Sequence, residues 1–207
     1  MLDKEREYYS DSVKLIVGID EAGRGPLAGP VCAAAVIFPP DFADERIDDS
    51  KQISEKKREE LFEIVKEHAL AYGIAMVSAD EIDQYNIYRA TQMAMQAALA
   101  QIDCRYDLIL TDAMPLTDLP APVIPIIKGD AQCLNIAGAS ILAKVTRDRY
   151  MRELAKQHPH FSFAIHKGYG TALHLKELEE YGPIAGVHRK SFGPVKKRLS
   201  KQLSLFQ

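Results

Sequence analysis

Two apolar runs lie close together near the start of the chain, in the stretch KLIVGIDEAGRGPLAGPVCAAAVIF, Lys14 to Phe38. The segment between them is rich in glycine and proline, which is typical of a turn between strands. We therefore predict strands over Lys14–Asp20 and Gly29–Phe38, paired as a hairpin and ended by Pro39-Pro40. A chain with this beginning is expected to start its sheet with antiparallel strands.

Further strand and helix patterns follow along the chain. A third strand is predicted over Leu70–Val77, and two apolar strands over Asp107–Asp112 and Val123–Ile127. Helical patterns occupy residues 54–69, 78–102, 133–157 and 172–181, whereas residues 158–171 are predicted to be irregular. Antiparallel strands followed by alternating strands and helices predict one α/β domain, with a mixed sheet and helices on its faces.

Two details of the helical patterns predict local structure. Ser78 and Glu81 have the spacing of a capping box, so we expect a helix to begin after Ser78. The residues from Ala137 to Ser140 are all small, so their helix is expected to pack closely against a neighbour.

The composition is ordinary for a soluble globular protein, with 47% hydrophobic and 27% charged residues among 207. No apolar run reaches the ~18 residues of a membrane span, and the charged N-terminus lacks the apolar core of a signal peptide. We therefore expect a cytoplasmic protein. Cys32, Cys104 and Cys133 lie far apart and are expected to be reduced and mostly buried.

The net charge of -3 argues against a general binder of polyanions, but the basic residues are unevenly distributed. Residues 187–201 contain no acid and six basic residues: Arg189, Lys190, Lys196, Lys197, Arg198 and Lys201. This local excess either contacts a phosphate backbone or forms a solvated, flexible end, and composition does not decide between the two.

Three acids occupy similar places at the ends of apolar strands. Asp20 and Asp112 end two of the predicted strands, and Asp130 follows a third just before a helix. If these strands are neighbours, the carboxylates gather at one edge of the sheet, where their mutual repulsion calls for a cation. Ligation by oxygen alone suits Mg²⁺ or Mn²⁺. The alternative is that each acid is an ordinary turn residue.

Glu21 directly follows Asp20, and this adds a condition. Successive residues of a strand point to opposite faces, so the two acids share a site only if the strand stops there. Gly23 and Gly25 are compatible with such a stop, and they let backbone N–H groups approach a phosphate or a sugar hydroxyl closely.

These residues belong to a longer set of motifs. GIDEAGRGPLAGPV resembles the opening signature of ribonuclease HII, the type 2 ribonuclease H family, in its bacterial form. Further blocks resemble the same family and follow in its order: DDSKQIS near 48–54, LTDA at 110–113, KGDAQCLNIAGASILAKVTRDRY at 128–150, HKGYGT at 166–171 and HRKSFGPV at 188–195. The resemblance extends from Val17 to Val195.

The resemblance implies a ribonuclease H-like fold, in which helices flank a five-stranded mixed sheet, with a small C-terminal helical extension. It divides the chain into a catalytic domain over residues 1–186, a basic helical segment over 187–201 and a tail over 202–207. The implied activity is that of an endonuclease that hydrolyses the RNA strand of RNA–DNA hybrids. Such an enzyme also incises on the 5′ side of single ribonucleotides in duplex DNA, as in ribonucleotide excision repair, and leaves 3′-hydroxyl and 5′-phosphate ends.

Carried over by motif, the resemblance assigns two divalent ions, Mn²⁺ or Mg²⁺, to four catalytic acids: Asp20, Glu21, Asp112 and Asp130. In two-metal hydrolysis one ion activates the attacking water, and the other stabilises the leaving 3′-oxygen. Whether Glu21 contacts metal by its side chain, by its backbone carbonyl or through water is left open.

The same resemblance assigns residues that recognise the substrate. The turn residues Gly23, Arg24 and Gly25 would read the 2′-hydroxyl of the ribonucleotide, largely through the backbone. Tyr169 would stack on the sugar at the RNA–DNA junction.

Four residues are candidates for contacts with backbone phosphates: Lys51, Ser140, Lys144 and Arg147. The last three share one helix face by their spacing, and the alternative is a merely solvated surface. Asp148 lies one helical step off this face and is expected to form a salt bridge that anchors the helix, not to bind metal. The histidines show no pair with convincing metal-ligand spacing, and His166 is expected near the Tyr169 loop without an assigned role.

The C-terminal pentapeptide QLSLF, residues 202–206, resembles the short peptide by which bacterial replication and repair proteins bind the polymerase sliding clamp. Leu203, Leu205 and Phe206 would be the apolar anchors, and Gln202 a polar specificity contact. The alternative is that these apolar residues fold back onto the domain.

Two other functions compete with the metal-dependent endonuclease. The first is a non-catalytic hybrid-binding module of the same fold, but such a module is expected to have lost at least one of the four acids. The second is the sister family ribonuclease HIII, which carries an extra N-terminal domain, whereas about thirteen residues precede the first predicted strand here. A monomer is expected, and the preferred ion is left open.

Overall fold

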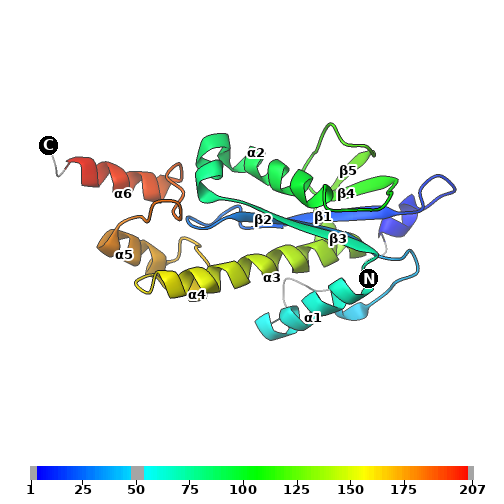
Figure 1. Ribbon diagram of the computed structural model, residues 1–207, viewed down its shortest axis with the longest axis horizontal. Coiled ribbons are helices and arrows are strands. Elements are labelled where there is room, and N and C mark those ends of the chain that lie inside the picture. The colour runs from blue at the N-terminus through cyan, green and yellow to red at the C-terminus, as the bar shows by residue number, and fades with distance from the viewer. Residues whose placement is uncertain (1–3, 48–53, 205–207) are drawn as a thin grey trace.

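A five-stranded mixed sheet forms the centre of the fold, with its strands in the order β3-β2-β1-β4-β5 (Figure 1). The structure is a computed structural model, and it describes residues 4–47 and 54–204. The strands are β1 (Ile16–Ala22), β2 (Val31–Ile37), β3 (Ala71–Val77), β4 (Leu108–Asp112) and β5 (Val123–Ile126). The predicted mixed sheet of five strands is confirmed.

The strand pairing explains how the sheet gathers carboxylates. β1 pairs antiparallel with β2, and β2 pairs antiparallel with β3, so the predicted hairpin is confirmed. β4 pairs parallel with β1, and β5 pairs parallel with β4. Parallel neighbours end at the same edge of a sheet. Asp20 on β1 and Asp112 on β4 therefore lie at one edge.

Helices cover both faces of the sheet (Figure 1). They are α1 (Glu55–His68), α2 (Ala79–Leu99), α3 (Leu134–Gln157), α4 (Phe163–His166), α5 (Ala172–Tyr181) and α6 (Gly193–Ser204). On one face, the core around α2 includes Val17, Ile19 and Ala35. On the other face, Ala34 and Val36 pack with α1 and α3. Because strand side chains alternate between faces, one short hairpin supplies both cores.

The predicted capping box at the start of α2 is confirmed. The backbone N–H of Glu81 donates to Ser78 Oγ at 3.3 Å, and the N–H of Ser78 donates to Glu81 Oε2 at 2.9 Å. A simpler cap begins α1, where Ser54 Oγ accepts from the N–H of Lys57 at 3.3 Å. These side chains satisfy N–H groups that have no partner within their own helix.

The close packing of α3 predicted from its small residues is confirmed. A Cβ on Gly138 would lie 2.8 Å from Cε2 of Phe38, and a Cβ on Gly18 of β1 would lie only 2.2 Å from the carbonyl carbon of Asn135. The side chain of Asn135 fixes this contact, because its Oδ1 accepts from the N–H of Phe38 at 2.7 Å. The backbone of α3 thus lies directly on β1.

Two of the predicted boundaries are wrong. β1 does not stop at Asp20 but continues to Ala22, because Glu21 pairs with Ala33 and Ala22 with Cys32 of the hairpin partner. Residues 158–171, predicted to be irregular, contain the single helical turn α4, which is followed by Lys167 in a left-handed conformation.

The basic segment over residues 187–201 is helical only from Gly193 onward. Its first part packs into the domain: the N–H of Gly29 donates to the carbonyl of Val187 at 2.9 Å, and the N–H of Arg189 donates to that of Leu27 at 2.9 Å. Arg189 is fully buried. A solvated basic end and a surface for phosphates are therefore both wrong for Arg189, since it lies in the interior.

Both edges of the sheet carry a residue that restricts further strand pairing. On edge strand β3, the side chain of Gln101 accepts from the N–H of Ile74 at 3.2 Å and donates to its carbonyl at 2.8 Å. This is the pair of hydrogen bonds that a neighbouring strand would otherwise make. The other edge strand, β5, contains Pro125, which has no N–H to donate.

The cysteines are free thiols, with Cys32 and Cys133 buried and Cys104 exposed. Burial raises the pKa of Cys32 and of Cys133 to about 12, so both stay protonated at neutral pH. The expectation of mostly buried thiols is confirmed. Within residues 4–47 and 54–204, no helix is long and apolar enough to cross a membrane.

Gly18→Ala is expected to lower the free energy of unfolding by about 3 kcal/mol, because the added methyl would collide with the backbone of α3 and not with a movable side chain. Urea unfolding followed by circular dichroism measures the loss. Gly193→Ala is the matched control, because a Cβ there meets nothing within 4 Å among the described residues. Equal stability of the two variants would contradict the close contact between α3 and β1.

Candidate active site

Three carboxylates converge at the edge of the sheet where β1 and β4 end. One oxygen each from Asp20, Asp112 and Asp130 lies within 4.8 Å of the others, and Asp20 and Asp130 are buried. Asp130 arrives through the short helix η3 (Gly129–Ala131), which follows Lys128 in a left-handed conformation after β5. Three successive returns of the chain to one edge therefore build the cluster, and the predicted meeting of these acids is confirmed as geometry.

Backbone N–H groups orient two of the three acids. The N–H of Glu21 donates to Asp20 Oδ1 at 2.7 Å, and the N–H of Gly129 donates to Asp112 Oδ1 at 2.9 Å. These bonds fix one oxygen of each carboxylate. The orientation of both carboxylates is therefore set by backbone groups in β1 and η3, which the fold already holds in place.

The cluster carries more negative charge than its surroundings easily accommodate. Burial, and then the carboxylates of Glu21 and Asp112, raise the pKa of Asp20 well above its ordinary value, and the hydroxyl of Ser140 opposes this only in part. Buried like charges repel one another, and a divalent cation bound between them would remove the repulsion. The donors are all oxygens, which Mg²⁺ and Mn²⁺ prefer. The residues present therefore fit a hard divalent ion.

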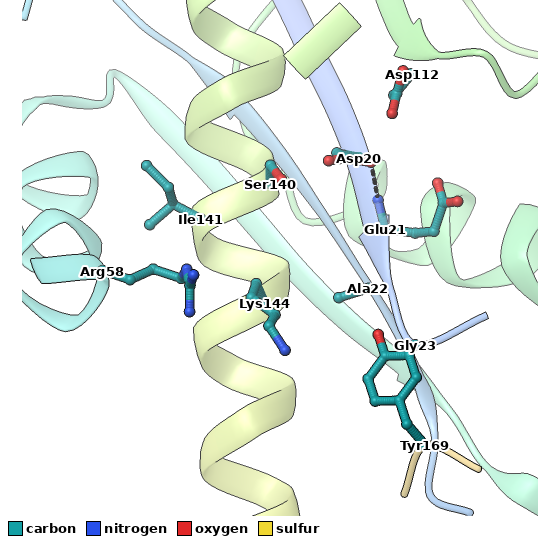
Figure 2. A pocket seen from close by; sticks show the side chains of 10 residues that line it. All are labelled: Asp20, Glu21, Ala22, Gly23, Arg58, Asp112, Ser140, Ile141, Lys144 and Tyr169. Carbon is teal, nitrogen blue, oxygen red and sulfur yellow. Dashed lines mark hydrogen bonds between the residues drawn. The ribbon is translucent and has the colours of Figure 1, made fainter. Parts of the chain in front are cut away.

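Glu21 lies beside the three acids but outside their cluster, as Figure 2 shows for its side chain relative to Asp20. Its Oε1 accepts from Arg24 Nη1 at 3.2 Å, and its Oε2 is buried and accepts no hydrogen bond from any described residue. Burial raises the pKa of Glu21, although the Arg24 guanidinium opposes the rise. The condition that the strand must stop after Asp20 is wrong, because both acids lie on one continuous strand and still border the same site.

An open cavity of about 320 Å³ extends from these acids along α3 (Figure 2). Its lining includes Asp20, Glu21, Ala22, Gly23, Arg58, Asp112, Ser140, Ile141, Lys144 and Tyr169. Figure 2 shows Asp20, Glu21 and Asp112 at one end and Tyr169 at the other. Lys144 projects from α3, and Arg58 lies on the opposite side of α3, on α1. One surface therefore combines acids of the cluster with positive charge.

Of the three candidate phosphate contacts on α3, two line this cavity and the third does not. Ser140 and Lys144 line it, and Lys144 Nζ pairs with Asp148 Oδ1 at 2.8 Å, which confirms the expected salt bridge of Asp148. Tyr169 also lines the cavity and is 42% exposed, with Lys144 Nζ 5.9 Å from its ring centre. Lys51 lies outside the described residues.

Arg147 is not a surface residue, so the predicted contact with a phosphate is wrong for it. Its side chain is 1% exposed. It donates from Nε, Nη1 and Nη2 to the carbonyls of Pro30, Lys167 and Ala28, at 2.9, 3.0 and 3.1 Å. A Cβ on Gly23, whose φ is 99°, would lie 2.1 Å from Arg147 Nε. Arg147 therefore fills the space beneath the Gly-Arg-Gly turn, and its N–H groups donate to backbone carbonyls.

Arg189 is a second buried arginine at this turn, and sequence reasoning missed its role. It donates to the carbonyls of Gly29, Arg24 and Gly23, at 3.0, 3.0 and 2.7 Å. Burial and the nearby charge of Arg147 lower its pKa to about 9. These bonds hold the carbonyls of Gly23 and Arg24 inward. The opposite side of the turn therefore faces the solvent, where Arg24 and Gly25 are exposed.

Arg58 on α1 was also missed. It lines the cavity although it comes from a helix with no assigned role. A signal was present in the sequence: Arg58 stands one turn before the buried Leu61 and Phe62, on the face that α1 turns toward the core. A cation at the end of an apolar helix face is well placed to reach a neighbouring groove.

The Ribonuclease HII family model matches residues 17–195 of the chain. The ribonuclease HII of Ruminiclostridium cellulolyticum is 50% identical over 192 residues, which cover 93% of this chain and 75% of that protein. The ribonuclease HII of Geobacillus thermodenitrificans is also 50% identical, over 198 residues, which cover 96% of this chain and 76% of that protein.

Similar solved structures support the architecture. The crystal structure of ribonuclease H2 from Pyrococcus horikoshii OT3 has a TM-score of 0.77 at 24% identity, covering 90% of this chain and 98% of that one. The ribonuclease HII in a PCNA:RNase HII complex from Archaeoglobus fulgidus has a TM-score of 0.66 at 24% identity, covering 84% and 92%. Bst-RNase HIII in complex with Mn²⁺ has a TM-score of 0.69 at 14% identity, covering 92% and 71%. The predicted ribonuclease H-like fold is confirmed.

Asp112→Asn is expected to weaken Mn²⁺ binding by at least the ~10–100-fold that loss of an outer-shell partner costs a metal site. The amide removes one of the three converging charges but keeps an oxygen that accepts from Gly129 N–H, so the fold should persist. Isothermal titration calorimetry with Mn²⁺ measures the change. Asp103→Asn, an exposed change on the loop before β4, is the control. Equal Mn²⁺ affinity in both variants would contradict the assignment of the cluster as a metal site.

Proposed function

The chain belongs to the ribonuclease HII family and is an endoribonuclease, and we propose that it acts on RNA–DNA hybrids and on single ribonucleotides in duplex DNA. In the proposed reaction it incises on the 5′ side of the ribonucleotide and leaves 3′-hydroxyl and 5′-phosphate ends. One observation carries the proposal: Asp20 and Asp112, two of the three converging acids, line the same cavity as Gly23 and Tyr169. A cutting site and a site for inspecting the sugar thus lie side by side.

The four acids would hold Mn²⁺ or Mg²⁺, two ions in the reacting complex, with Asp20, Asp112 and Asp130 as the central ligands. Bound there, such ions would supply an activated water, stabilisation of the leaving 3′-oxygen and neutralisation of charge at phosphorus. Glu21, with a buried carboxylate oxygen that no described residue hydrogen-bonds, is placed to contribute from the side. The Mn²⁺ complex of Bst-RNase HIII, a protein of the same fold, supports a divalent cofactor.

The Gly-Arg-Gly turn would recognise the ribonucleotide by its 2′-hydroxyl, the group that separates RNA from DNA. Arg189 holds the carbonyls of Gly23 and Arg24 inward, so a sugar would meet the opposite side of the turn. Gly25 is exposed there, and a Cβ built on it would lie 3.9 Å from Cε1 of Tyr169. The turn and the ring thus lie side by side, so one sugar would contact both, with Tyr169 stacking on it.

Contacts with backbone phosphates would come from the cationic part of the cavity. Ser140 and Lys144 line the cavity from α3, and Arg58 lines it from α1. Lys51 stays a prediction, because it lies outside the described residues. Cations a short distance from the acids would neutralise phosphates of the strand that neighbour the one to be cleaved.

The same observations favour this function over its competitors. A hybrid-binding module without catalysis has no need of three converging acids that repel one another, two of them buried, and here all four acids are present. The family model that matches residues 17–195 is that of ribonuclease HII and not of its sister family. The cytoplasmic location, the monomeric state and the role in ribonucleotide excision repair stay predictions.

Cleavage of a duplex with one embedded ribonucleotide tests the proposal. With Mn²⁺ or Mg²⁺ we expect a single incision 5′ of the ribonucleotide, and the product ends can be mapped by gel electrophoresis and by ligation. A chelator should abolish it, and Asp112→Asn should bind the duplex but cleave it slower by orders of magnitude. Activity that survives the chelator, or near-normal turnover by Asp112→Asn, would refute the mechanism.

Gly25→Ala is expected to lower kcat/KM on the single-ribonucleotide duplex by about tenfold or more, because its methyl would intrude between the turn and Tyr169. The fold should be unaffected, since the new Cβ makes only an ordinary contact of 3.9 Å. The assay compares it with Gly193→Ala, whose melting temperature and cleavage should match those of the wild type. Full activity of Gly25→Ala would argue against the turn as the reader of the sugar.

We also propose that the C-terminal tail binds the polymerase sliding clamp through Gln202, Leu203, Leu205 and Phe206. Leu205 and Phe206 lie outside the described residues, and the basic helix α6 ends just before them at Ser204. The PCNA:RNase HII complex from Archaeoglobus fulgidus, whose ribonuclease has the same fold, supports a clamp as partner. Surface plasmon resonance on an immobilised bacterial clamp should detect the full chain but not a chain that lacks residues 202–206. Equal binding of the two chains would refute this proposal.

A further inference from the structure

Three histidines lie buried behind Tyr169, a group that no sequence spacing indicated. His174 and His188 are fully buried, and His166 is 6% exposed. They come from α5, from the non-helical segment before α6, and from the end of α4. The rings of His166 and His174 stack with their centres 4.2 Å apart, and the ring of Phe161 packs 4.9 Å from that of His188. This is a closed aromatic layer with little access for water.

The hydrogen bonds of His188 and His174 fix where each ring carries its proton. The N–H of Ile184 donates to His188 Nδ1 at 3.0 Å, so the proton of a neutral His188 is on Nε2. That Nε2 lies 3.1 Å from His174 Nε2, which must therefore accept. The proton of His174 is then on Nδ1, and it donates to the carbonyl of Tyr169 at 2.9 Å. One direction of donation runs from Ile184 to Tyr169.

Only one arrangement of protons satisfies this chain. It begins at a backbone N–H, which can only donate, and it ends at a backbone carbonyl, which can only accept. A proton added to His174 would sit on Nε2 and face the Nε2–H of His188, and a proton added to His188 would sit on Nδ1 and face the N–H of Ile184. Burial, and then the neighbouring histidine, lowers the pKa of His188 to about 3, and burial and His166 lower the pKa of His174.

His166 completes the support of the same loop from its other side. The N–H of Gly168 donates to His166 Nδ1 at 3.1 Å, so its Nε2–H donates to Glu177 Oε2 at 3.0 Å. The N–H of Tyr169 donates to the carbonyl of His166 at 2.9 Å. The backbone of Tyr169 is therefore held on both its donor and its acceptor side, while its ring stays in the cavity.

The segment that carries His188 also contacts the turn that would read the sugar. His188 forms an isolated antiparallel bridge with Ala28, and the N–H of Leu27 donates to the carbonyl of Gly168 at 2.8 Å. His188 thus adjoins the segment that follows the Gly-Arg-Gly turn, and it is linked to the carbonyl of Tyr169 through His174. A shift of the Tyr169 loop or of residues 27–28 would therefore displace His174 or His188.

We propose that His174 and His188 are positioning residues, a relay of two neutral imidazoles that holds the carbonyl of Tyr169 and so sets the place of its ring against Gly25. The proposal rests on the proposed function, in that the ring so placed contacts the ribonucleotide sugar. Neither histidine touches the substrate. Loss of the relay should therefore leave metal binding intact and lower turnover.

Nuclear magnetic resonance of the protein with ¹⁵N-labelled histidine tests the relay without any substrate. Two-dimensional ¹H–¹⁵N spectra of the imidazoles distinguish the two tautomers by their nitrogen shifts. We expect His188 as the Nε2–H form and His174 as the Nδ1–H form, both unchanged between pH 6 and pH 8, about the range in which an unperturbed histidine titrates. His174 in the Nε2–H form, or titration of either ring in this range, overturns the proposal.

Two variants of His174 separate positioning from packing. In His174→Asn the amide can take the place of Nδ1 and still donate to Tyr169, whereas in His174→Gln it reaches the place of Nε2 and cannot. We expect kcat on the single-ribonucleotide duplex to fall about threefold or less for Asn and about tenfold or more for Gln, with Mn²⁺ affinity unchanged in both. His160→Gln, an exposed histidine stacked on Tyr181, is the matched control.

Equal kcat for the Asn and Gln variants would overturn the proposal, whatever their melting temperatures. If the wild type fails to cleave the duplex, the proposed function fails, and the relay is then judged without substrate. In that case nuclear Overhauser contacts between the Tyr169 ring and Gly25 should persist in His174→Asn and be lost in His174→Gln. Their persistence in both variants overturns the positioning role.

Discussion

The direct contact of α3 with β1 at Gly18 is the constraint on which the candidate active site depends. There is no room for a methyl group between Gly18 and the backbone at Asn135, so strand and helix are held at a fixed distance. Asp20 lies two residues further along the strand, and Ser140 further along the helix, so the same contact sets their separation. Asp130 precedes the helix by one short turn and is placed by it as well. A metal site demands placement to fractions of an ångström, and here backbone against backbone provides it.

A second feature is the use of buried arginines without carboxylate partners. Arg147 and Arg189 donate to backbone carbonyls of residues 23–30 and 167, so peptide dipoles satisfy their charge. A buried carboxylate would hold them more strongly, but it would add negative charge close to three acids that already repel one another. Burial of these guanidinium groups costs desolvation and their closeness adds repulsion, and both lower the pKa of Arg189. In return, the hydrogen bonds of the two arginines rigidify a loop rich in glycine, which would otherwise be free to move.

The sequence predicted those parts of the fold that depend on local pattern. The hairpin and the capping box at Ser78 follow from residues near one another in the chain, and the structure confirms them. It also confirms that Asp20, Asp112 and Asp130 meet, which followed from the apolar strand pattern before each acid. Arg147 and Arg189 were misread because their partners are carbonyl oxygens, which every residue carries and no sequence pattern marks. The end of β1 was misplaced because the hairpin partner continues to pair past Asp20. The buried histidines were missed because three separate segments bring them together.

The two edges of the sheet carry a consequence for how this protein meets others. Gln101 occupies both hydrogen-bonding groups of Ile74 on β3, and Pro125 removes a donor from β5. A strand from another molecule would have to displace the Gln101 side chain at β3, or pair at β5 without a hydrogen bond from Pro125. Neither edge strand therefore readily accepts another strand. Growth of the sheet into a larger assembly, ordered or aggregated, is thereby discouraged at high protein concentration. Any partner must recognise the molecule through its helices, loops or chain ends, and not by lengthening its sheet.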